Sequence, residues 1–472
     1  MSTDSTSSPA LDRARRKAYL RLTPLLFLSY MIAYVDRVNV AFAKLTMSKD
    51  MPAFDNAVIG TGAGVFFLGY FLLEIPGTLI VERWSARKWI SRIMISWGIV
   101  AALTAWVTTP REFYMVRFML GLAEAGFFPG VLVYLTHWFP QKDRARAFAL
   151  FFIATPIAQV ISPTISNQLL KIGLTETING VALTHPLVLG LKGWQWVYVG
   201  WAIPAVVLGV LVLFLLPDWP KDARWLTREE SQALAWELAR EKAARKSDRH
   251  LTVLQALRNP RVLLLAAAYF CVVTAQYGTE FFLPSLLERW YQLKLDTLAA
   301  LVIIPPIGAL LGQVLMAWSS DRTKERKLHT VVPIAIGAVA LALTPPSLGA
   351  LWFTMALLIV ARTGLKAYMP AFWTLPGLFL TEAAAAGSVG LINSIGNLGG
   401  FLGPYVLGQV DKLTGSFHAG IYFLAATMSL ACVIVFFLGL GGGEKETPPA
   451  ALVEPRTPAL QQRAQLFAIV GP

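Results

Sequence analysis

The chain has 472 residues, of which 56% are apolar and only 15% are charged, with a mean hydropathy of +0.56. These proportions exclude a disordered chain, a collagen and a disulfide scaffold, and they are far from those of a soluble enzyme. A helix that crosses a bilayer needs about 20 mostly apolar residues, and the sequence offers twelve such runs. We therefore expect an all-α integral membrane protein with twelve transmembrane helices.

The apolar runs form two series of six, separated by a polar stretch. In that stretch Thr227 and Glu230 form a capping box, which predicts the start of an amphipathic helix because each side chain can satisfy a free backbone N–H. The predicted organisation is a tail over 1–21, a first bundle over 22–216, a linker over 217–260, a second bundle over 261–440 and a tail over 441–472. The runs lie at about 22–43, 58–81, 90–108, 113–136, 147–168, 194–216, 261–285, 298–318, 330–347, 350–379, 385–410 and 418–440.

The net charge of +13 predicts the orientation of the chain. Most of the 41 Lys and Arg residues fall on one side of the membrane when both termini and the linker are placed in the cytoplasm. Positive residues accumulate on the cytoplasmic side of membrane proteins, so both termini are expected there. The basic residues form no patch interleaved with aromatic residues, which argues against a nucleic-acid partner.

One loop pattern occurs twice, about half the chain apart. Each copy has an acidic residue followed by Arg, then three residues, then Arg and Lys, and each follows the second run of its series. Repetition at equivalent places predicts an internal duplication, and two repeated bundles around a central site are typical of secondary transporters. The predicted loop-motif residues are Glu82, Arg83 and Arg87 in the first copy, and Asp321, Arg322 and Arg326 in the second.

Charged residues also lie within the apolar runs. A charge at the bilayer centre costs at least about 2.5 kcal/mol, so such residues usually face a cavity and have a partner or a function. Four acids and four bases are of this kind, and their equal numbers suggest mutual compensation. They are Asp36, Glu74, Glu124 and Glu280, with Arg37, Arg117, Arg362 and Lys366.

Four of these residues are candidates for binding an anion and a proton. Arg37 can clamp a substrate carboxylate through two parallel hydrogen bonds. Its neighbour Asp36 must point elsewhere, because adjacent side chains diverge by about 100° around a helix. Arg117 and Glu124 are two turns apart, roughly 10 Å along the axis, which is too far for a direct ion pair. A carboxylate near such an arginine would couple proton and anion binding, so Glu124, with Asp36 second, is the predicted proton site, and Arg117 is a further predicted coupling residue.

A second cationic cluster is predicted in the tenth apolar run. Arg362 and Lys366 are four residues apart and therefore share a helical face, with Glu280 as their counter-charge. The pair can bind a second anionic group of the substrate, or it can be a structural tie to Glu280, and the sequence leaves both open. Further residues expected to line the cavity are Tyr34, Tyr70, Gln159, Trp373, Asn393, Tyr277 and Gln276.

Several of these stretches resemble the anion:cation symporter family of the major facilitator superfamily. The similar segments are Tyr34-Val-Asp-Arg-Val-Asn39, Glu74-Ile-Pro76, Arg117-Phe-Met-Leu-Gly-Leu-Ala-Glu124, Trp138-Phe-Pro140 and Asn393-Ser-Ile-Gly-Asn397. Within the family the chain is most similar to bacterial tartrate and phthalate permeases. The resemblance implies the major facilitator fold of two pseudo-symmetric six-helix bundles in the bacterial inner membrane. It also implies proton-coupled uptake of a small organic anion by alternating access.

The resemblance assigns roles as well. It makes Glu124 the protonation site and implies that Asp36, Arg37 and Arg117 link protons to substrate. The chain departs from the family at Ser85, which replaces a glycine of the loop motif, and at Glu82, which replaces an aspartate. Where relatives carry a glutamine this chain has Thr155, with Gln159 one turn later, and Arg362 and Lys366 are outside the family pattern.

The leading hypothesis is therefore a monomeric transporter that imports a carboxylate or dicarboxylate with protons. An exchanger or exporter of the same fold without net proton coupling is the first alternative, and a membrane sensor built on a transporter fold is the second. An enzyme is not expected, because the sequence has no His-Glu-x-x-His or Gly-x-Ser-x-Gly motif. Neither a cofactor nor a metal is expected.

Overall fold

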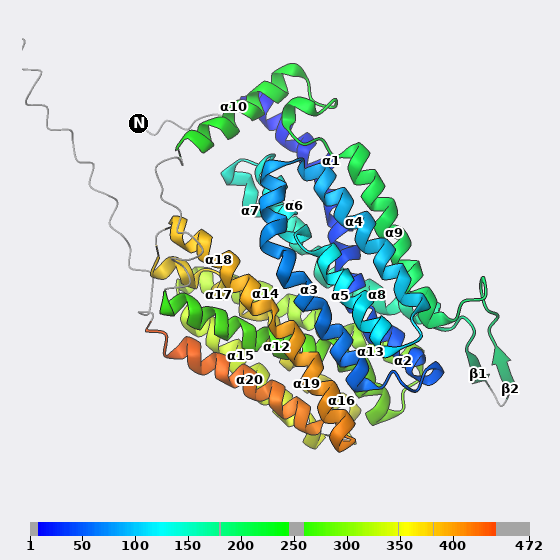
Figure 1. Cartoon of the computed structure of the whole chain (residues 1–472). Coiled ribbons are helices and arrows are strands. Elements are labelled where there is room, and N and C mark those ends of the chain that lie inside the picture. The colour runs from blue at the N-terminus through cyan, green and yellow to red at the C-terminus, as the bar shows by residue number, and fades with distance from the viewer. Residues whose placement is uncertain (1–7, 179–180, 245–258, 348, 381, 440–472) are drawn as a thin grey trace, which may run out of the picture.

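The structure, a computed structural model, describes residues 8–178, 181–244, 259–347, 349–380 and 382–439. Helices dominate these ranges and form two bundles that lie side by side (Figure 1). The predicted helical, two-bundle architecture is confirmed, with one correction. An antiparallel hairpin of β1 (Thr175–Ile178) and β2 (Val181–Thr184) projects from one end of the first bundle. It lies in the predicted loop between two spans, where backbone pairing outside the bundle satisfies its N–H and C=O groups.

The first bundle is formed by the chain from α1 to α9. Its helices are α1 (Pro9–Val38), α2 (Val40–Asp50), α3 (Asn56–Arg83), α4 (Ala86–Leu103), α5 (Pro110–Glu124), α6 (Phe127–Thr136), α7 (Gln141–Phe152), α8 (Ala154–Leu170) and α9 (Gly193–Leu215). The second bundle consists of α12 (Pro260–Tyr291), α13 (Leu295–Val302), α14 (Ile304–Thr323), α15 (Lys327–Leu343), α16 (Leu351–Ala367), α17 (Met369–Phe372), α18 (Glu382–Asn397), α19 (Gly399–Thr414) and α20 (His418–Phe436).

Consecutive helices combine into membrane spans. In the described part of the chain, ten segments are long and apolar enough to cross a membrane, and α15 is apolar but shorter. The successive helices α18 and α19 supply one further segment. The break predicted between the ninth and tenth runs is present, since α15 ends at Leu343, a 3-10 turn covers Pro345–Ser347 and α16 begins at Leu351.

The two ends of the first bundle are marked by α10 (Arg228–Ala244) and by the hairpin, and we call them the α10 side and the hairpin side (Figure 1). The predicted capping box begins α10, with Thr227 N donating to Glu230 at 3.0 Å and Glu230 N donating to Thr227 at 3.2 Å. Lys17 of α1 forms an ion pair with Glu230 at 2.7 Å. Because of such contacts the polar stretch before residue 22 is helical from Pro9 onward.

Several spans are broken within the membrane. The sharpest break separates α5 from α6, where Gly126 has a φ of +84° that only glycine adopts without strain. A Cβ at Gly126 would also lie 3.1 Å from the Cα of Gly77 on α3. Glu124, the last residue of α5, is thus held at an interruption of its span. Irregular backbone at membrane depth is typical of cavity walls.

The bundles contact each other mainly through α3 against α19 and α2 against α12. Small residues allow this approach. A Cβ at Gly60 would come within 2.2 Å of the Pro404 carbonyl oxygen, so α3 and α19 touch through their backbones. The polar residues expected in a cavity are carried on the helices around this contact.

Candidate functional site

The centre of the site is a buried ion pair between Arg37 of α1 and Glu124 of α5. Arg37 Nη2 donates to Glu124 Oε1, and Arg37 Nη1 lies 3.4 Å from the Tyr277 hydroxyl of the second bundle. The guanidinium carbon also lies 5.1 Å from the ring centre of Tyr70 and 5.4 Å from that of Phe66. The substrate clamp predicted at Arg37 is therefore occupied by the predicted proton site.

Arg117 is the second arginine close to Phe66. Its guanidinium carbon lies 5.3 Å from the centre of that ring, so both arginines contact the same aromatic side chain. The side chain is fully buried, and Nε donates to the Gly62 carbonyl at 3.4 Å. Both Nη atoms of Arg117 have no hydrogen-bond partner in the described structure. Arg117 forms no ion pair with Glu124 there, as their spacing on α5 predicted.

Asp36 points away from Arg37. Its carboxylate accepts a hydrogen bond from Trp97 Nε1 of α4 at 2.7 Å and one from Asn39 Nδ2 at 3.4 Å. With 1% of its surface exposed, Asp36 lies in the interior of the first bundle. The predicted divergence of the Asp36 and Arg37 side chains is confirmed, and Asp36 is buried among helices of the first bundle.

A second buried pair joins Arg362 of α16 to Glu280 of α12, with Nη2 and Oε2 3.0 Å apart. Two residues of the first bundle reach this pair. Tyr34 donates its hydroxyl to Glu280, and Gln159 Nε2 donates to the Tyr34 hydroxyl at 2.6 Å. Arg362 Nη2 donates to Gln159 Oε1 at 3.1 Å. The predicted counter-charge of Arg362 is confirmed, and the network connects the two bundles.

Lys366 is half-buried one turn further along α16. It makes no hydrogen bond or ion pair in the part of the chain that the structure describes, so its predicted tie to Glu280 is not a direct contact. Thr155, which the resemblance places where relatives have glutamine, donates to the carbonyl of Phe152 in its own span. Gln159, one turn later, makes the cross-bundle contacts instead.

Two further predicted residues lie apart from the arginines. Asn393 Nδ2 of α18 donates to Glu74 of α3 at 2.8 Å, and Ser394 donates to the same carboxylate at 3.0 Å. Trp373 packs against Tyr269, with ring centres 5.0 Å apart. Asn393 therefore forms a second cross-bundle contact, whereas Trp373 belongs to an aromatic cluster of the second bundle.

A pocket of about 570 Å³, counting space open to solvent, lies beside the Arg362–Glu280 pair. Helices of both bundles form it, and its polar wall includes Gln159, Ser162 and Thr279 in addition to the pair. Its apolar wall includes Val38, Ala41, Leu283, Pro284, Val302 and Pro305. Of the predicted substrate-binding residues, Gln159 and Arg362 line this pocket.

The loop motifs brace single bundles on the α10 side. Asp218, which follows α9, accepts hydrogen bonds from the Ser85 hydroxyl at 2.7 Å and from the Arg87 backbone N–H at 2.9 Å. Ser85 also caps α4 by accepting from Lys88 N at 3.1 Å, which explains why serine is suitable where the family has glycine. Glu82 and Arg83 lie outside the residues whose side chains are described.

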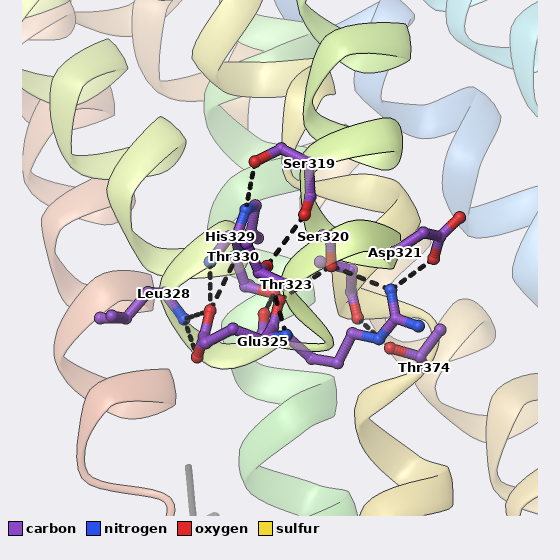
Figure 2. Close-up of polar contacts among 11 residues, drawn as sticks. Ser319, Ser320, Asp321, Thr323, Glu325, Leu328, His329, Thr330 and Thr374 are labelled. Atoms are coloured by element: carbon purple, nitrogen blue, oxygen red, sulfur yellow. Dashed lines mark hydrogen bonds and ion pairs between the residues drawn. The ribbon is translucent and has the colours of Figure 1, made fainter. Parts of the chain in front are cut away.

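The second copy of the motif folds into a local network (Figure 2). Arg326 Nη1 contacts Asp321 at 2.6 Å and the Ser320 hydroxyl at 3.0 Å. Arg322 lies apart from these bonds, with its guanidinium carbon 5.4 Å from the Trp318 ring centre. Glu325, which was not among the predicted motif residues, accepts from the backbone N–H of Leu328 at 2.8 Å and so caps α15 (Figure 2).

Sequence reasoning missed a group of polar contacts on the hairpin side. Asn56 Nδ2 of α3 donates to Asp411 of α19 at 2.8 Å, and Arg289 of α12 pairs with the same carboxylate at 2.5 Å. Lys44 lies 3.6 Å from the ring centre of Phe282. Lys44 and Asp411 each fall one residue beyond a predicted apolar run, and they are buried because α2 and α19 continue past those ends.

Ion pairs also bridge the bundles on the hairpin side. Lys49 pairs with Glu288 at 3.0 Å, and Lys171 pairs with Asp296 at 2.7 Å. Lys412 pairs with Asp55 at 3.1 Å. On the α10 side, the ion pairs among the described residues stay within one bundle. Three ion pairs therefore hold the two bundles together on the hairpin side.

Comparison with known proteins identifies the family. The family model described as Major Facilitator Superfamily matches residues 26–404. The chain belongs to the major facilitator superfamily. It is therefore a transporter of small organic substrates and not an enzyme, and it is a multi-pass protein of the inner membrane.

Similar proteins support this identification. A protein of Agrobacterium vitis named "Putative tartrate transporter" is 40% identical over 94% of each chain. The "Quinolone resistance transporter" of Acinetobacter baumannii is 38% identical over 90% of this chain and 94% of its own. Among solved structures, a D-xylose-proton symporter has a TM-score of 0.68 at 14% identity, covering 89% of this chain and 97% of its own. At that identity the likeness supports the fold alone.

Proposed function

We propose that this transporter carries a small organic anion together with a proton by alternating access. The observation that carries the proposal is the pairing of two arginines, the partly buried Arg37 and the buried Arg362, each with one buried carboxylate and each in contact with the opposite bundle. An anion that takes the place of either carboxylate would change contacts between the bundles. Buried ionisable groups within a membrane are typical of substrate and proton pathways.

The Arg37–Glu124 pair supplies the coupling. A proton on Glu124 cancels the charge that holds Arg37, so the guanidinium becomes free for a substrate carboxylate. Conversely, an anion bound at Arg37 removes the counter-charge of Glu124 and favours its protonation, because linkage between two ligands is reciprocal. Arg117, which also contacts the Phe66 ring, keeps positive charge near Glu124, and Asp36 is a second candidate proton site.

The structure supports an inward-facing assignment. Ion pairs close the hairpin side, and the loops that carry most Lys and Arg residues lie on the α10 side, which we assign to the cytoplasm together with both termini. The loop-motif residues would brace each bundle as the bundles rock. Both bundles and the pocket come from one chain, so we propose a monomer as the working unit.

The test begins with binding. Purified protein is screened by thermal shift against L-tartrate, succinate and phthalate, because a ligand of the folded state raises its melting midpoint. Arg37→Ala should abolish the shift, whereas Arg111→Ala, a matched change at an exposed arginine, should keep it. Arg37→Lys retains the charge but not the planar fork and should weaken binding at least about tenfold. Unchanged affinity in folded Arg37→Ala would exclude the clamp.

Transport then tests the coupling. Proteoliposomes with an imposed pH gradient should accumulate the anion that gives the largest thermal shift, and dissipating the gradient should stop accumulation. Counterflow without any effect of the gradient would favour the exchanger or exporter, which the 38% identical quinolone resistance relative keeps as the second candidate. Binding without any flux in either assay would favour the sensor.

A further inference from the structure

Three buried donors of the pocket lack partners. Ser162 of α8, Thr279 of α12 and Arg362 of α16 line the same pocket, and the donors in question are Ser162 Oγ, Thr279 Oγ1 and Arg362 Nη1. None of these atoms has a hydrogen-bond partner in the described structure. Ser162 is 1% exposed and Thr279 is 4% exposed, so bulk water does not satisfy them. Buried polar groups are nearly always hydrogen-bonded, so several unpaired donors on residues around one cavity are typical of a ligand-binding site.

The charge beside the pocket indicates the kind of ligand. Arg362 and Lys366 carry two positive charges against the single negative charge of Glu280. One positive charge is therefore unmatched, and one more carboxylate would neutralise the cluster. A guanidinium N–H and two hydroxyl groups can all donate to a carboxylate, which has acceptor sites for each of them.

We propose that Ser162, Thr279 and Arg362 form a subsite for a second carboxylate of the transported anion. The inference rests on the proposed function, in which Arg37 receives the first carboxylate, and it identifies the substrate as a dicarboxylate. Ser162 belongs to the first bundle and Thr279 to the second, so the bound carboxylate joins the two bundles.

The rest of the pocket restricts the carbon skeleton. Val38, Ala41, Leu283 and Pro284 offer no hydrogen-bonding side chain to a hydroxyl group of the ligand. The other polar residues of the pocket, Gln159 and Glu280, already bond to each other, to Tyr34 and to Arg362. A hydroxyl that enters an apolar wall loses its water without compensation. The skeleton beside the second carboxylate is therefore unhydroxylated, and succinate, glutarate or adipate should bind better than L-tartrate.

The test compares matched acids by calorimetric titration of the purified full chain. Each dicarboxylate, succinate, glutarate or adipate, is paired with the monocarboxylate of equal length, butyrate, valerate or hexanoate. Ser162→Ala and Thr279→Val should each weaken the best dicarboxylate by about tenfold to 150-fold, as expected for the loss of a hydrogen bond to a charged group. Neither should change the affinity for the monocarboxylate.

Ser166→Ala is the control for the serine variant. Ser166 lies one turn along α8 from Ser162, but its hydroxyl already accepts from Trp201 Nε1 at 3.1 Å. Its removal should leave both affinities unchanged. Equal losses for mono- and dicarboxylates in Ser162→Ala and Thr279→Val, or no loss for either, would overturn the subsite.

The outcomes separate this inference from the proposed function. Binding of L-tartrate at least as tight as that of succinate would overturn the apolar selection. Wild-type protein that binds mono- and dicarboxylates equally, with the Arg37 requirement intact, would overturn the second subsite and leave proton-coupled anion transport standing. Wild-type protein that binds none of these acids would overturn both.

Discussion

Replacing Glu124 with glutamine should abolish the pH dependence of anion binding. In the structure Glu124 is the carboxylate that contacts Arg37, so one proton is linked to the release of that guanidinium. One linked proton changes the dissociation constant up to about tenfold per pH unit, equivalent to about 1.4 kcal/mol, across the range where Glu124 titrates. In Glu124→Gln the competitor is always neutral, so the constant should vary by less than about twofold over the same range.

The same substitution has a measurable cost in stability. Removing one partner of a buried ion pair typically costs about 3–5 kcal/mol. Arg37 keeps the Tyr277 hydroxyl and the rings of Tyr70 and Phe66, so we expect a loss near the lower end, about 3 kcal/mol, in the absence of ligand. A bound anion can replace Glu124, so saturating ligand should recover most of the lost melting midpoint.

The assay is isothermal titration at unit steps of pH. Glu229→Gln serves as the control, because it makes the same chemical change at a side chain that is 74% exposed. That control should retain the pH slope of the wild type. A Glu124→Gln protein that also retains the slope would refute the coupling, because another group would then carry the proton.

Other predictions concern separate parts of the molecule. Lys366→Ala should leave the melting midpoint nearly unchanged, but calorimetric titration should show a larger loss of affinity for dicarboxylates than for monocarboxylates relative to the wild type. Arg362→Ala should lower the free energy of unfolding by about 3 kcal/mol, because Glu280 stays buried without its partner. An equal loss of affinity for both classes of acid would make the two cations structural. Gly126→Ala should lower the stability by about 1–2 kcal/mol because of its φ of +84°, which thermal unfolding can measure. A hydrogen bond from Lys17 lowers the pKa of Glu230, so its contact with α1 should be complete above pH 4.5, the ordinary value, and weaken as the pH falls below it. The protection of α10 backbone amides against hydrogen exchange, measured relative to their intrinsic exchange rates, should therefore fall in acid. Glu230→Gln should remove that pH dependence.

Much of the architecture follows from the sequence because bilayer thickness imposes a length on apolar runs. The Pro345–Ser347 break and the capping box at Thr227 were both predicted, since proline and cap residues act locally. The hairpin was not predicted, because its strands lie in a loop and carry no strong alternating pattern. The predicted helix ends lie too early in the chain where a charged residue follows an apolar run, as at Lys44. The helix continues there because the charged side chain has a buried partner, in this case the Phe282 ring.

The ion pairs and hydrogen bonds inside the site were harder to predict from the sequence. The sequence predicted that Arg362 faces Glu280, because charges in a membrane need partners. It could not predict that Arg37 is held by Glu124, since that contact depends on where the folded bundle places α1 and α5. Ser162 and Thr279 carried no signal at all, because isolated hydroxyl residues in membrane helices usually bond to their own backbone.

The ion pairs of Lys49, Lys171 and Lys412 on the hairpin side make the contact between the bundles sensitive to the ionic strength of the solution. Lys49 is 67% exposed and Lys412 is 56% exposed, so dissolved ions reach these bridges. At an ionic strength of 0.15 M, electrostatic attraction between exposed groups fades over about 8 Å, and in more dilute media it extends further. Low ionic strength would therefore strengthen these ion pairs and high ionic strength would weaken them, while the Asn56–Asp411 hydrogen bond would remain. In the proposed orientation, a higher ionic strength would therefore favour opening of the hairpin side even without substrate.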